Sequence, residues 1–314
     1  MTPSSRSDPS RGRPPGVAAV VVNFNAGDHL ASCVRSLVSE PMVTEVIVVD
    51  NGSSDGSLGS LAELQEGVGT DVKVIESGWN RGYGGGANLG VRATREALVL
   101  VCNPDVVIMP GAVSELAAFM SRDPEIAIVG PRLEEADGAL YPSARRFPSF
   151  TDAVGHGLVG LFTSDNRFSR RYKMLDSDRL ISQEVDWVSG ACFLARRQAY
   201  TSLGGFDESY FMYMEDVDLC WRAWRAGWKV AYEPAATAVH VQGISTARSP
   251  YLMTLAHHRS LLRYVSKTSS GPQRALVPLV AAGIAARAGM ICARDALVVV
   301  RSSGQRAGRG RVLR

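Results

Sequence analysis

The sequence predicts an α/β fold: a mostly parallel sheet with helices on both faces, followed by a helical extension at the C-terminus. Long apolar runs alternate with segments of helical spacing through the first 105 residues. This β-α-β-α order is typical of a parallel sheet covered by helices. Each run also ends in Asn, Asp, Gly or Ser, which is typical of loops that bind ligands at the carboxyl ends of strands.

Four strands and three helices are predicted in this part of the chain. The continuous apolar character of the runs indicates strands that are buried on both faces. The predicted strands are 17–25, 44–50, 71–77 and 97–105, and the predicted helices are 28–40, 58–67 and 87–96. The stretch "NRGYGGGAN" (80–88) between the third strand and the third helix is predicted to be a glycine loop.

The second half is less regular. Prolines interrupt residues 131–186, where no substrate contact is assigned. A strand, a helix and a Gly204-Gly205 turn are predicted over 185–211, and a strand-turn-strand over 227–243 ends at His240. The chain from about residue 250 has helical character.

Composition and charge limit the class of partner. The 314-residue chain has a net charge of +3, which argues against nucleic acid as a partner. Residues 1–16 and 301–314 are basic and have the composition of disordered arms. The five cysteines form no metal-type cluster and favour a reducing compartment. The N-terminus lacks a secretory signal, so we expect a cytoplasmic protein.

A second apolar stretch bears on membrane contact. Charged residues interrupt 275–300, and the longest uncharged part, Ala275 to Ala286, has about 12 residues. A bilayer requires about 20. We therefore expect a helix that packs on the protein or lies on a membrane without spanning it.

Three acids stand among aromatic residues in "YFMYMEDVDLCWRAWRAGW" (210–228). The spacing of Val217, Trp221, Trp224 and Trp228 predicts the apolar face of a helix that starts near Glu215. One interpretation is that the acids only stabilise the positive end of this helix. The other is that one of them is a general base.

Two kinds of enzyme fit the motifs, and a binding protein stays open as a third reading. "GYGGGA" (82–87) matches a dinucleotide-binding pattern, with Asp105 where an acid would hold a ribose. That turn normally follows the first strand, however, which here ends in "NFN". Sugar transfer from a nucleotide diphosphate needs a base pocket, a metal and a carboxylate base, for which Asp50, Asp105, His240 and Asp216 are candidates. A nucleotide-sugar-binding protein without catalysis would share these features.

Five motifs in order resemble family 2 glycosyltransferases, and most closely the bacterial rhamnosyltransferase branch. They are "VVVNFN", "VIVVDNGSSDGS", "NRGYGGGANLG", "NPD" and "GGFDESYFMYMEDVDLCWRAWRAG", spread over roughly residues 17–245. The resemblance implies a GT-A fold over 17–248, with a helical extension over 249–300. It also implies a nucleotide-sugar donor, a divalent metal (Mg²⁺ or Mn²⁺) and inversion at the anomeric carbon.

The resemblance assigns roles to single residues. Asp50 resembles the acid that contacts the nucleobase, Asp105 the metal-binding acid, and Asp216 the catalytic base. His240 is similar to the late metal ligand of the family. The family's DxD element reads Asn103-Pro104-Asp105 here, so its first acid is neutral. The predicted donor-binding residues are Asn23, Asn25, Asp50, Asn80, Arg81, Gly82 and Asn103; the acceptor-binding residues are Trp187, Ser189 and Gly190; the supporting acids are Glu215 and Asp218.

The resemblance also implies a reaction. The Q-x-x-R-W element of processive synthases is absent, which favours addition of a single sugar. The branch implies L-rhamnose, from dTDP-rhamnose, and a polyprenyl-diphosphate-linked N-acetylglucosamine acceptor in cell-wall polysaccharide synthesis. A lipid-linked acceptor implies a peripheral enzyme on the inner face of the cell membrane. The oligomeric state is left open, with a dimer as one option.

Overall fold

The computed structural model describes residues 16–61, 70–147, 174, 179–241 and 250–292. The two predicted basic arms lie outside these residues, except for Gly16. So does much of the irregular stretch 131–186.

The first half of the chain builds a parallel sheet, as the sequence predicts. The strands are β1 (Val17–Asn23), β2 (Val43–Asp50), β3 (Asp71–Glu76) and β4 (Leu98–Cys102), in the order β3-β2-β1-β4. The connecting elements are α1 (His29–Val38), the 3-10 helix η1 (Ser57–Leu61) and α3 (Gly82–Ala93). All pairings between these four strands are parallel.

The second half extends the same sheet in the order β4-β11-β6-β12-β5. β11 (Cys192–Arg196) runs antiparallel to both of its neighbours, and β12 (Lys229–His240) runs parallel to β6 (Ile126–Glu134). β8 (Ala144–Arg145) and β10 (Trp187–Val188) form a separate two-stranded sheet. The other elements are β5 (Val106–Ile108), α4 (Ala112–Ser121), β7 (Leu140–Tyr141), β9 (Gln183–Glu184), α7 (Arg197–Ser202), α8 (Glu215–Arg225), α9 (Pro250–Thr268) and η2 (Gly271–Leu276).

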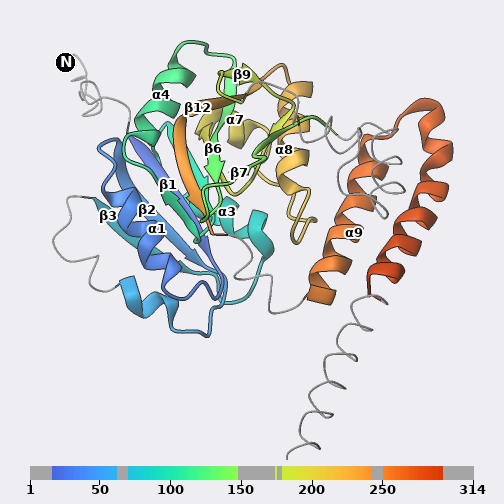
Figure 1. Ribbon diagram of the computed structural model, residues 1–314, viewed down its shortest axis with the longest axis horizontal. Helices are drawn as coiled ribbons and strands as arrows, with labels where there is room; N and C mark the ends of the chain where they lie inside the picture. Colours follow the sequence, from blue (N-terminus) through green and yellow to red (C-terminus); the bar gives the residue numbers. More distant parts are fainter. Residues whose placement is uncertain (1–15, 62–69, 148–173, 175–178, 242–249, 293–314) are drawn as a thin grey trace, which may run out of the picture.

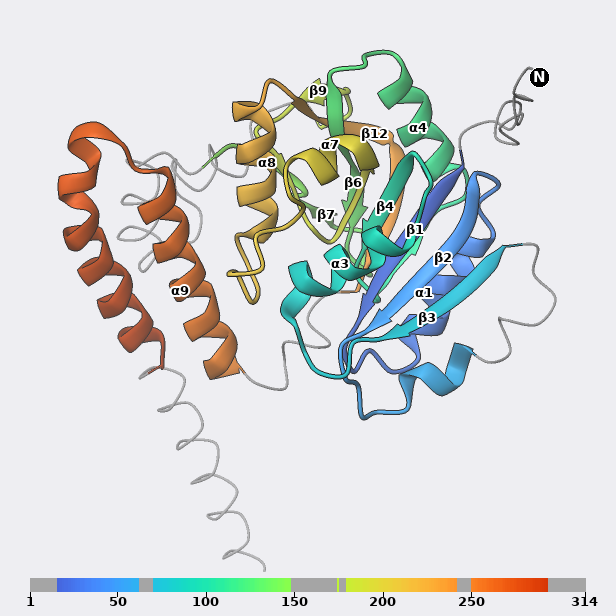
Figure 2. The same ribbon diagram turned by 180° about the vertical axis from the view of Figure 1, so that it is seen from behind.

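Helices cover both faces of the sheet, and each face has its own core. Successive side chains of β1 point to opposite faces, so Val21 belongs to the core that includes α1 and α4, whereas Val20 belongs to the core that includes α3, α7 and α8. Figures 1 and 2 show the two helical layers from opposite sides. Burying one such valine or leucine contributes about 1.5–3 kcal/mol, and the two cores together hold the strand ends in place.

The glycine run is helical, which differs from the predicted loop. Gly82 begins α3, and the following glycines lie inside this buried helix. A Cβ on Gly86 would lie 2.7 Å from Val22 Cγ1, and one on Gly90 would lie 2.4 Å from Val20 Cγ1. The glycines therefore let α3 lie close to β1, which outweighs their low helix propensity of about 1 kcal/mol each. A dinucleotide-binding turn at this point is not present.

The C-terminal extension is helical, as predicted. Figures 1 and 2 show α9 beside a second helix, the two forming a hairpin on the α8 side of the molecule. Tyr264 of α9 is buried in the core that contains α8. The second helix is longer than the uncharged run suggests: Gly271–Cys292 has 22 residues and is, by length and composition, long and apolar enough to cross a membrane, and only 6% of its most apolar 18 residues are buried. Most of its residues are exposed.

Candidate active site

The sheet topology gathers the predicted site residues at one edge. β1 and β2 end in register at Asn23 and Asp50, and β4 ends on the same edge at Cys102. β12 brings its last residue, His240, beside Val106 at the start of β5. Asn103 and Asp105 lie between β4 and β5, so they face the end of β12.

Asp50 organises the loop that follows β2. Its Oδ1 accepts hydrogen bonds from Asn23 Nδ2 at 2.8 Å and from the Ser53 hydroxyl. Its Oδ2 accepts from the backbone N–H groups of Gly52 at 3.1 Å and Ser53 at 3.0 Å. Both oxygens are thus engaged in a residue that is 4% exposed. In this conformation the Asp50 carboxylate stabilises the loop after β2 through these hydrogen bonds.

Other predicted donor-binding residues also hold loops. Asn25, in the left-handed region at φ 53°, accepts from Ser54 N at 2.8 Å through its Oδ1. Asn80 Oδ1 accepts from Gly82 N at 2.9 Å. The Arg81 guanidinium stacks 4.6 Å from the centre of the Trp79 ring, which is 59% exposed. Trp79 was not singled out in the sequence, and it gives the rim of the site an aromatic face.

Asp105 and His240 form a pair suited to a divalent ion. His240 Nε2 lies 3.3 Å from Asp105 Oδ1 and 3.4 Å from Asn103 Nδ2. Asp105 Oδ1 and His240 Nδ1 are buried and have no hydrogen-bond partner among the described residues. Buried polar atoms normally have partners, and a carboxylate with an imidazole is a common ligand set.

The pair does not make a complete metal centre by itself. Within the described ranges, no third His, Cys, Asp or Glu joins Asp105 and His240. A bound ion would take its remaining ligands from the side chain of Asn103, a phosphate or water. Mg²⁺ in particular is often held by one or two carboxylates with phosphates and water, so the residues fit such an ion.

Asp216 is held at the start of α8 with its carboxylate fixed. Its Oδ2 accepts from Gly190 N at 2.9 Å, and its Oδ1 accepts from Val217 N at 2.8 Å. The side chain is still partly exposed. Burial raises the pKa of Asp216 above its ordinary value, while the two backbone N–H groups and the charge of Arg145 oppose this rise. The arrangement suits a carboxylate that accepts a proton.

The two neighbouring acids have other surroundings. Glu215 is buried, and its Oε2 has no hydrogen-bond partner among the described residues. Burial, followed by the charge of Asp216, raises the pKa of Glu215 well above its ordinary value. Asp218 is 0% exposed and forms ion pairs at 2.7 Å with Arg222 and with Lys267. Asp218 thus faces away from the site.

The aromatic face of α8 is shorter than the sequence suggests. The helix begins at Glu215, as predicted, and ends at Arg225. Trp228 therefore lies beyond the helix, which differs from the predicted face. Val217 is buried, whereas Trp221 and Trp224 are half-buried at its margin.

Residues 189–191 connect the two halves of the site. Gly190 donates to Asp216, as described above, and its carbonyl accepts the Tyr83 hydroxyl. The next carbonyl, of Ala191, accepts from Asn103 N at 2.8 Å. Three consecutive residues thus join the predicted base to the Asp105–His240 pair. Ser189 belongs to this segment, and its N–H donates to Ser143 O at 2.7 Å.

Trp187 supports this region from inside. It is 4% exposed, and its Nε1 donates to Arg146 O at 2.8 Å. The guanidinium of Arg145 lies 5.0 Å above its ring. The sequence predicts that Trp187 lines the acceptor pocket. In the structure its ring is covered and is not presented to solvent.

Arg145 is a functional candidate that could not be predicted from the sequence. Besides Trp187, it lies 5.7 Å from the Tyr141 ring, which itself packs edge-on against His240 at 5.6 Å. A cation therefore lies between the predicted base and the predicted metal pair. Arg145 reaches this position through the pairing of β8 with β10, a long-range contact that the basic stretch "RRFPS" does not reveal.

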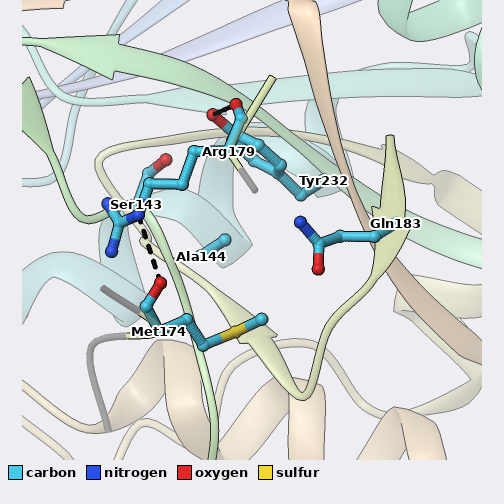
Figure 3. A pocket seen from close by; sticks show the side chains of 6 residues that line it. All are labelled: Ser143, Ala144, Met174, Arg179, Gln183 and Tyr232. Carbon is cyan, nitrogen blue, oxygen red and sulfur yellow. Dashed lines mark hydrogen bonds between the residues drawn. The ribbon is translucent and has the colours of Figure 1, made fainter. Parts of the chain in front are cut away.

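A small pocket lies beside β8 (Figure 3). Its lining residues are Ser143, Ala144, Met174, Arg179, Gln183 and Tyr232. None of them is a predicted site residue; Ser143, whose carbonyl accepts the Ser189 N–H, links this pocket to the site.

Comparison with known proteins assigns the family. Residues 14–259 match the family described as "Glycosyltransferase like family 2". The chain is 37% identical over 273 residues to the N-acetylglucosaminyl-diphospho-decaprenol L-rhamnosyltransferase of Mycobacterium tuberculosis, which covers 82% of this chain and 86% of the relative. It is 27% identical over 232 residues to the Rhamnosyltransferase WbbL of Escherichia coli K12, which covers 71% of this chain and 83% of the relative.

A solved structure supports the fold. The mannosyltransferase PcManGT from Pyrobaculum calidifontis, in complex with GDP-Man and Mn²⁺, matches with a TM-score of 0.58. The match covers 93% of this chain and 83% of that chain, at 15% identity. It confirms the predicted GT-A architecture, and the match to the family confirms the predicted enzyme class. The chain belongs to glycosyltransferase family 2 and is a glycosyltransferase.

Proposed function

We propose that this glycosyltransferase adds a single L-rhamnose, from dTDP-rhamnose, to a polyprenyl-diphosphate-linked N-acetylglucosamine with inversion at the anomeric carbon. The observation that carries the proposed chemistry is Asp216, a partly exposed carboxylate whose two oxygens are fixed by backbone N–H groups. Fixed geometry is what a general base requires. The choice of substrates is supported by the likeness to the mycobacterial rhamnosyltransferase.

The proposed reaction is a displacement. The acceptor hydroxyl oxygen attacks the anomeric carbon, the bond from that carbon to the donor diphosphate breaks, and the hydroxyl proton passes to Asp216. The nucleoside diphosphate leaves. Attack opposite to the leaving group inverts the anomeric configuration. Segment 189–191 would hold the acceptor beside Asp216, because Gly190 donates to that carboxylate.

Residues at the strand ends would hold the donor. The loop organised by Asn23 and Asp50 would present its backbone to the nucleoside, and Trp79 with Arg81 would cover it from the rim. Asp105 and His240, with Asn103 beside them, would hold a divalent ion. Such an ion, when bound, would neutralise charge on the diphosphate.

Arg145 would bind a phosphate at the same point. A guanidinium is suited to phosphate oxygens because it can donate two parallel hydrogen bonds. Its place between Trp187 and Tyr141 puts it within reach of both halves of the site.

The test is a panel of nucleotide-sugar donors, incubated with a polyprenyl-diphosphate N-acetylglucosamine acceptor in Mg²⁺, in Mn²⁺ or in excess EDTA. We expect transfer from dTDP-rhamnose with a divalent metal. Asp105→Ala and His240→Ala should each weaken metal-dependent donor binding, measured by titration. Transfer from another donor alone would refute the proposed sugar, and full activity in EDTA would refute the metal.

A further inference from the structure

The loop before the catalytic helix is strained. Tyr213 and Met214 are consecutive residues with φ values of 68° and 67°. This left-handed region costs an ordinary residue of order 1–3 kcal/mol, so it persists only where the surroundings enforce it. The two residues directly precede Glu215 and Asp216. The strained turn therefore determines where the predicted base points.

The C-terminal helix α9 supplies contacts to this loop. Ser260 donates from its hydroxyl to Met212 O at 2.9 Å. The His257 ring packs edge-on against Tyr213 at 5.3 Å. Tyr210 at the start of the loop is buried beneath the cations of α9, with Arg263 5.5 Å from its ring centre. Three successive turns of one helix thus touch the loop.

Lys267 joins α9 to the catalytic helix itself. Its Nζ lies 2.7 Å from Asp218 Oδ1 and 2.9 Å from Asp207 Oδ2. The two acids flank the strained loop, one on each side. Asp218 is fully buried and is also paired with Arg222, whose guanidinium donates to the carbonyls of Leu203 and Gly205. Lys267 therefore bridges both ends of the loop.

We propose that α9 is a positioning element for the catalytic base, in which Lys267 acts through Asp218 and Asp207 to hold the loop that presents Asp216. This inference rests on the proposed function, because it takes Asp216 as the base. It gives Asp218 a role different from that of a supporting acid in the site. It also makes the C-terminal extension part of the catalytic machinery.

The test compares Lys267→Met, which removes the ammonium, with Lys267→Arg, which keeps a cation. Arg259→Met is the matched control, because Arg259 is exposed on the same helix. Asp218 keeps Arg222 in every variant, so we expect all of them to fold. Hydrogen exchange of the amides of residues 212–218 reports the position of the loop without requiring activity.

We expect faster exchange of residues 212–218 in Lys267→Met, with a kcat lower by about 10- to 100-fold, since a displacement of about 1 Å can cost ~10²-fold. Donor affinity should stay within about twofold, because in this proposal the loop positions the base rather than the donor. Lys267→Arg should recover most of both losses, and Arg259→Met should match the wild type.

The inference is overturned if exchange and kcat in Lys267→Met equal those of the wild type. It is also overturned if donor affinity falls together with kcat. If Lys267→Met fails to fold, Ser260→Ala replaces it, because that change removes only the hydrogen bond to Met212. Unchanged exchange and kcat in Ser260→Ala then overturn it. If the wild type transfers no sugar, the proposed function fails, while the exchange measurement still decides whether α9 holds the loop.

Discussion

Asp216 and Asp218 are two residues apart on one helix, yet they have opposite surroundings. Asp216 is partly exposed and accepts hydrogen bonds from two backbone N–H groups. Asp218 is fully buried and lies between two cations. A partly exposed carboxylate can reach the proton of a substrate hydroxyl, whereas one that is buried between two cations cannot. The same residue type therefore supplies the predicted base and a structural anchor.

Arg145→Gln should weaken binding of a diphosphate and shift the pH profile. The pKa of Asp216 is already raised by burial, and the charge of Arg145 opposes that rise. Removing this charge raises the pKa further. Asp216 then becomes protonated at a higher pH. The acid limb of the kcat/KM profile should therefore move to higher pH.

The profile is measured with saturating metal, and binding is measured separately with the free nucleoside diphosphate and with the lipid-linked acceptor. Weaker binding in only one of these two measurements identifies which diphosphate Arg145 contacts. The control Arg145→Lys keeps a cation, so it should leave the acid limb of the pH profile where it is in the wild type. A Gln variant with an unchanged acid limb and unchanged binding would remove Arg145 from the site.

At the scale of elements, the glycine-rich helix α3 shows where sequence patterns fail. The apolar runs of β1, β2 and β4 predict buried strands correctly because their burial is continuous along the chain. The start of α8 at Glu215 is also correct. A glycine run has low helix propensity, however, and only the close approach of α3 to β1 makes it helical. That approach is a tertiary contact, which local patterns do not contain.

Dependence on tertiary contacts also explains which residues of the site could not be predicted from the sequence. His240 ends β12 and Asp105 follows β4, and both strands can be predicted from the sequence. The pairing of the strands then brings the two side chains together. Arg145 depends on pairing between two short strands, and Lys267 depends on how α9 packs. Neither position follows from spacing or composition. Residues fixed by strand order could be predicted, and residues fixed by packing could not.

Gly82→Ala should destabilise the fold where the start of α3 contacts the loop of residues 210–214. Gly82 has a φ of 76°, and a Cβ there would lie 2.2 Å from Phe211 O. Strain of about 1–3 kcal/mol for the φ value, plus the clash, should appear as a lower free energy of unfolding. Urea denaturation measures it. Gly59→Ala is the control, because nothing lies within 4 Å of a Cβ at that position.

A free energy of unfolding for Gly82→Ala within about 0.5 kcal/mol of the wild type, the range of an ordinary surface change, would contradict this account of the junction. Gly82→Ala should also affect the active site around Asp216. Tyr83, the next residue, donates to the carbonyl of Gly190 and so contacts the segment that fixes Asp216.

For the whole molecule, the C-terminal extension has two functions in this account. α9 packs on the catalytic part through Tyr264 and Lys267. The next helix, within Gly271–Cys292, is apolar, and most of its residues are exposed. A lipid-linked acceptor lies at a bilayer surface, so exposed apolar residues on this helix would hold the enzyme at the surface that carries the acceptor. We therefore place the enzyme at the inner face of the membrane as a proposal.

Liposome flotation tests this location. Leu279→Asp, at a leucine that is 71% exposed, should reduce binding to anionic vesicles, whereas Leu180→Asp, at a leucine 74% exposed elsewhere, should not. Deletion of the arginine-rich tail 301–314, outside the described residues, should weaken binding further at low salt. Each arginine near an anionic surface contributes about 1 kcal/mol. Full-length protein that stays unbound at low salt would exclude this role.

The central claim is that Asp216 accepts the proton of the acceptor hydroxyl, and Asp216→Asn tests it most directly. Asparagine keeps the shape of the side chain but cannot take the proton. With dTDP-rhamnose, the lipid-linked acceptor and saturating metal, we expect turnover to fall by about 10²–10⁴-fold, the usual contribution of a general base. Donor affinity and the melting temperature should stay close to those of the wild type. Turnover near the wild-type rate would contradict the account, because the base would then lie elsewhere.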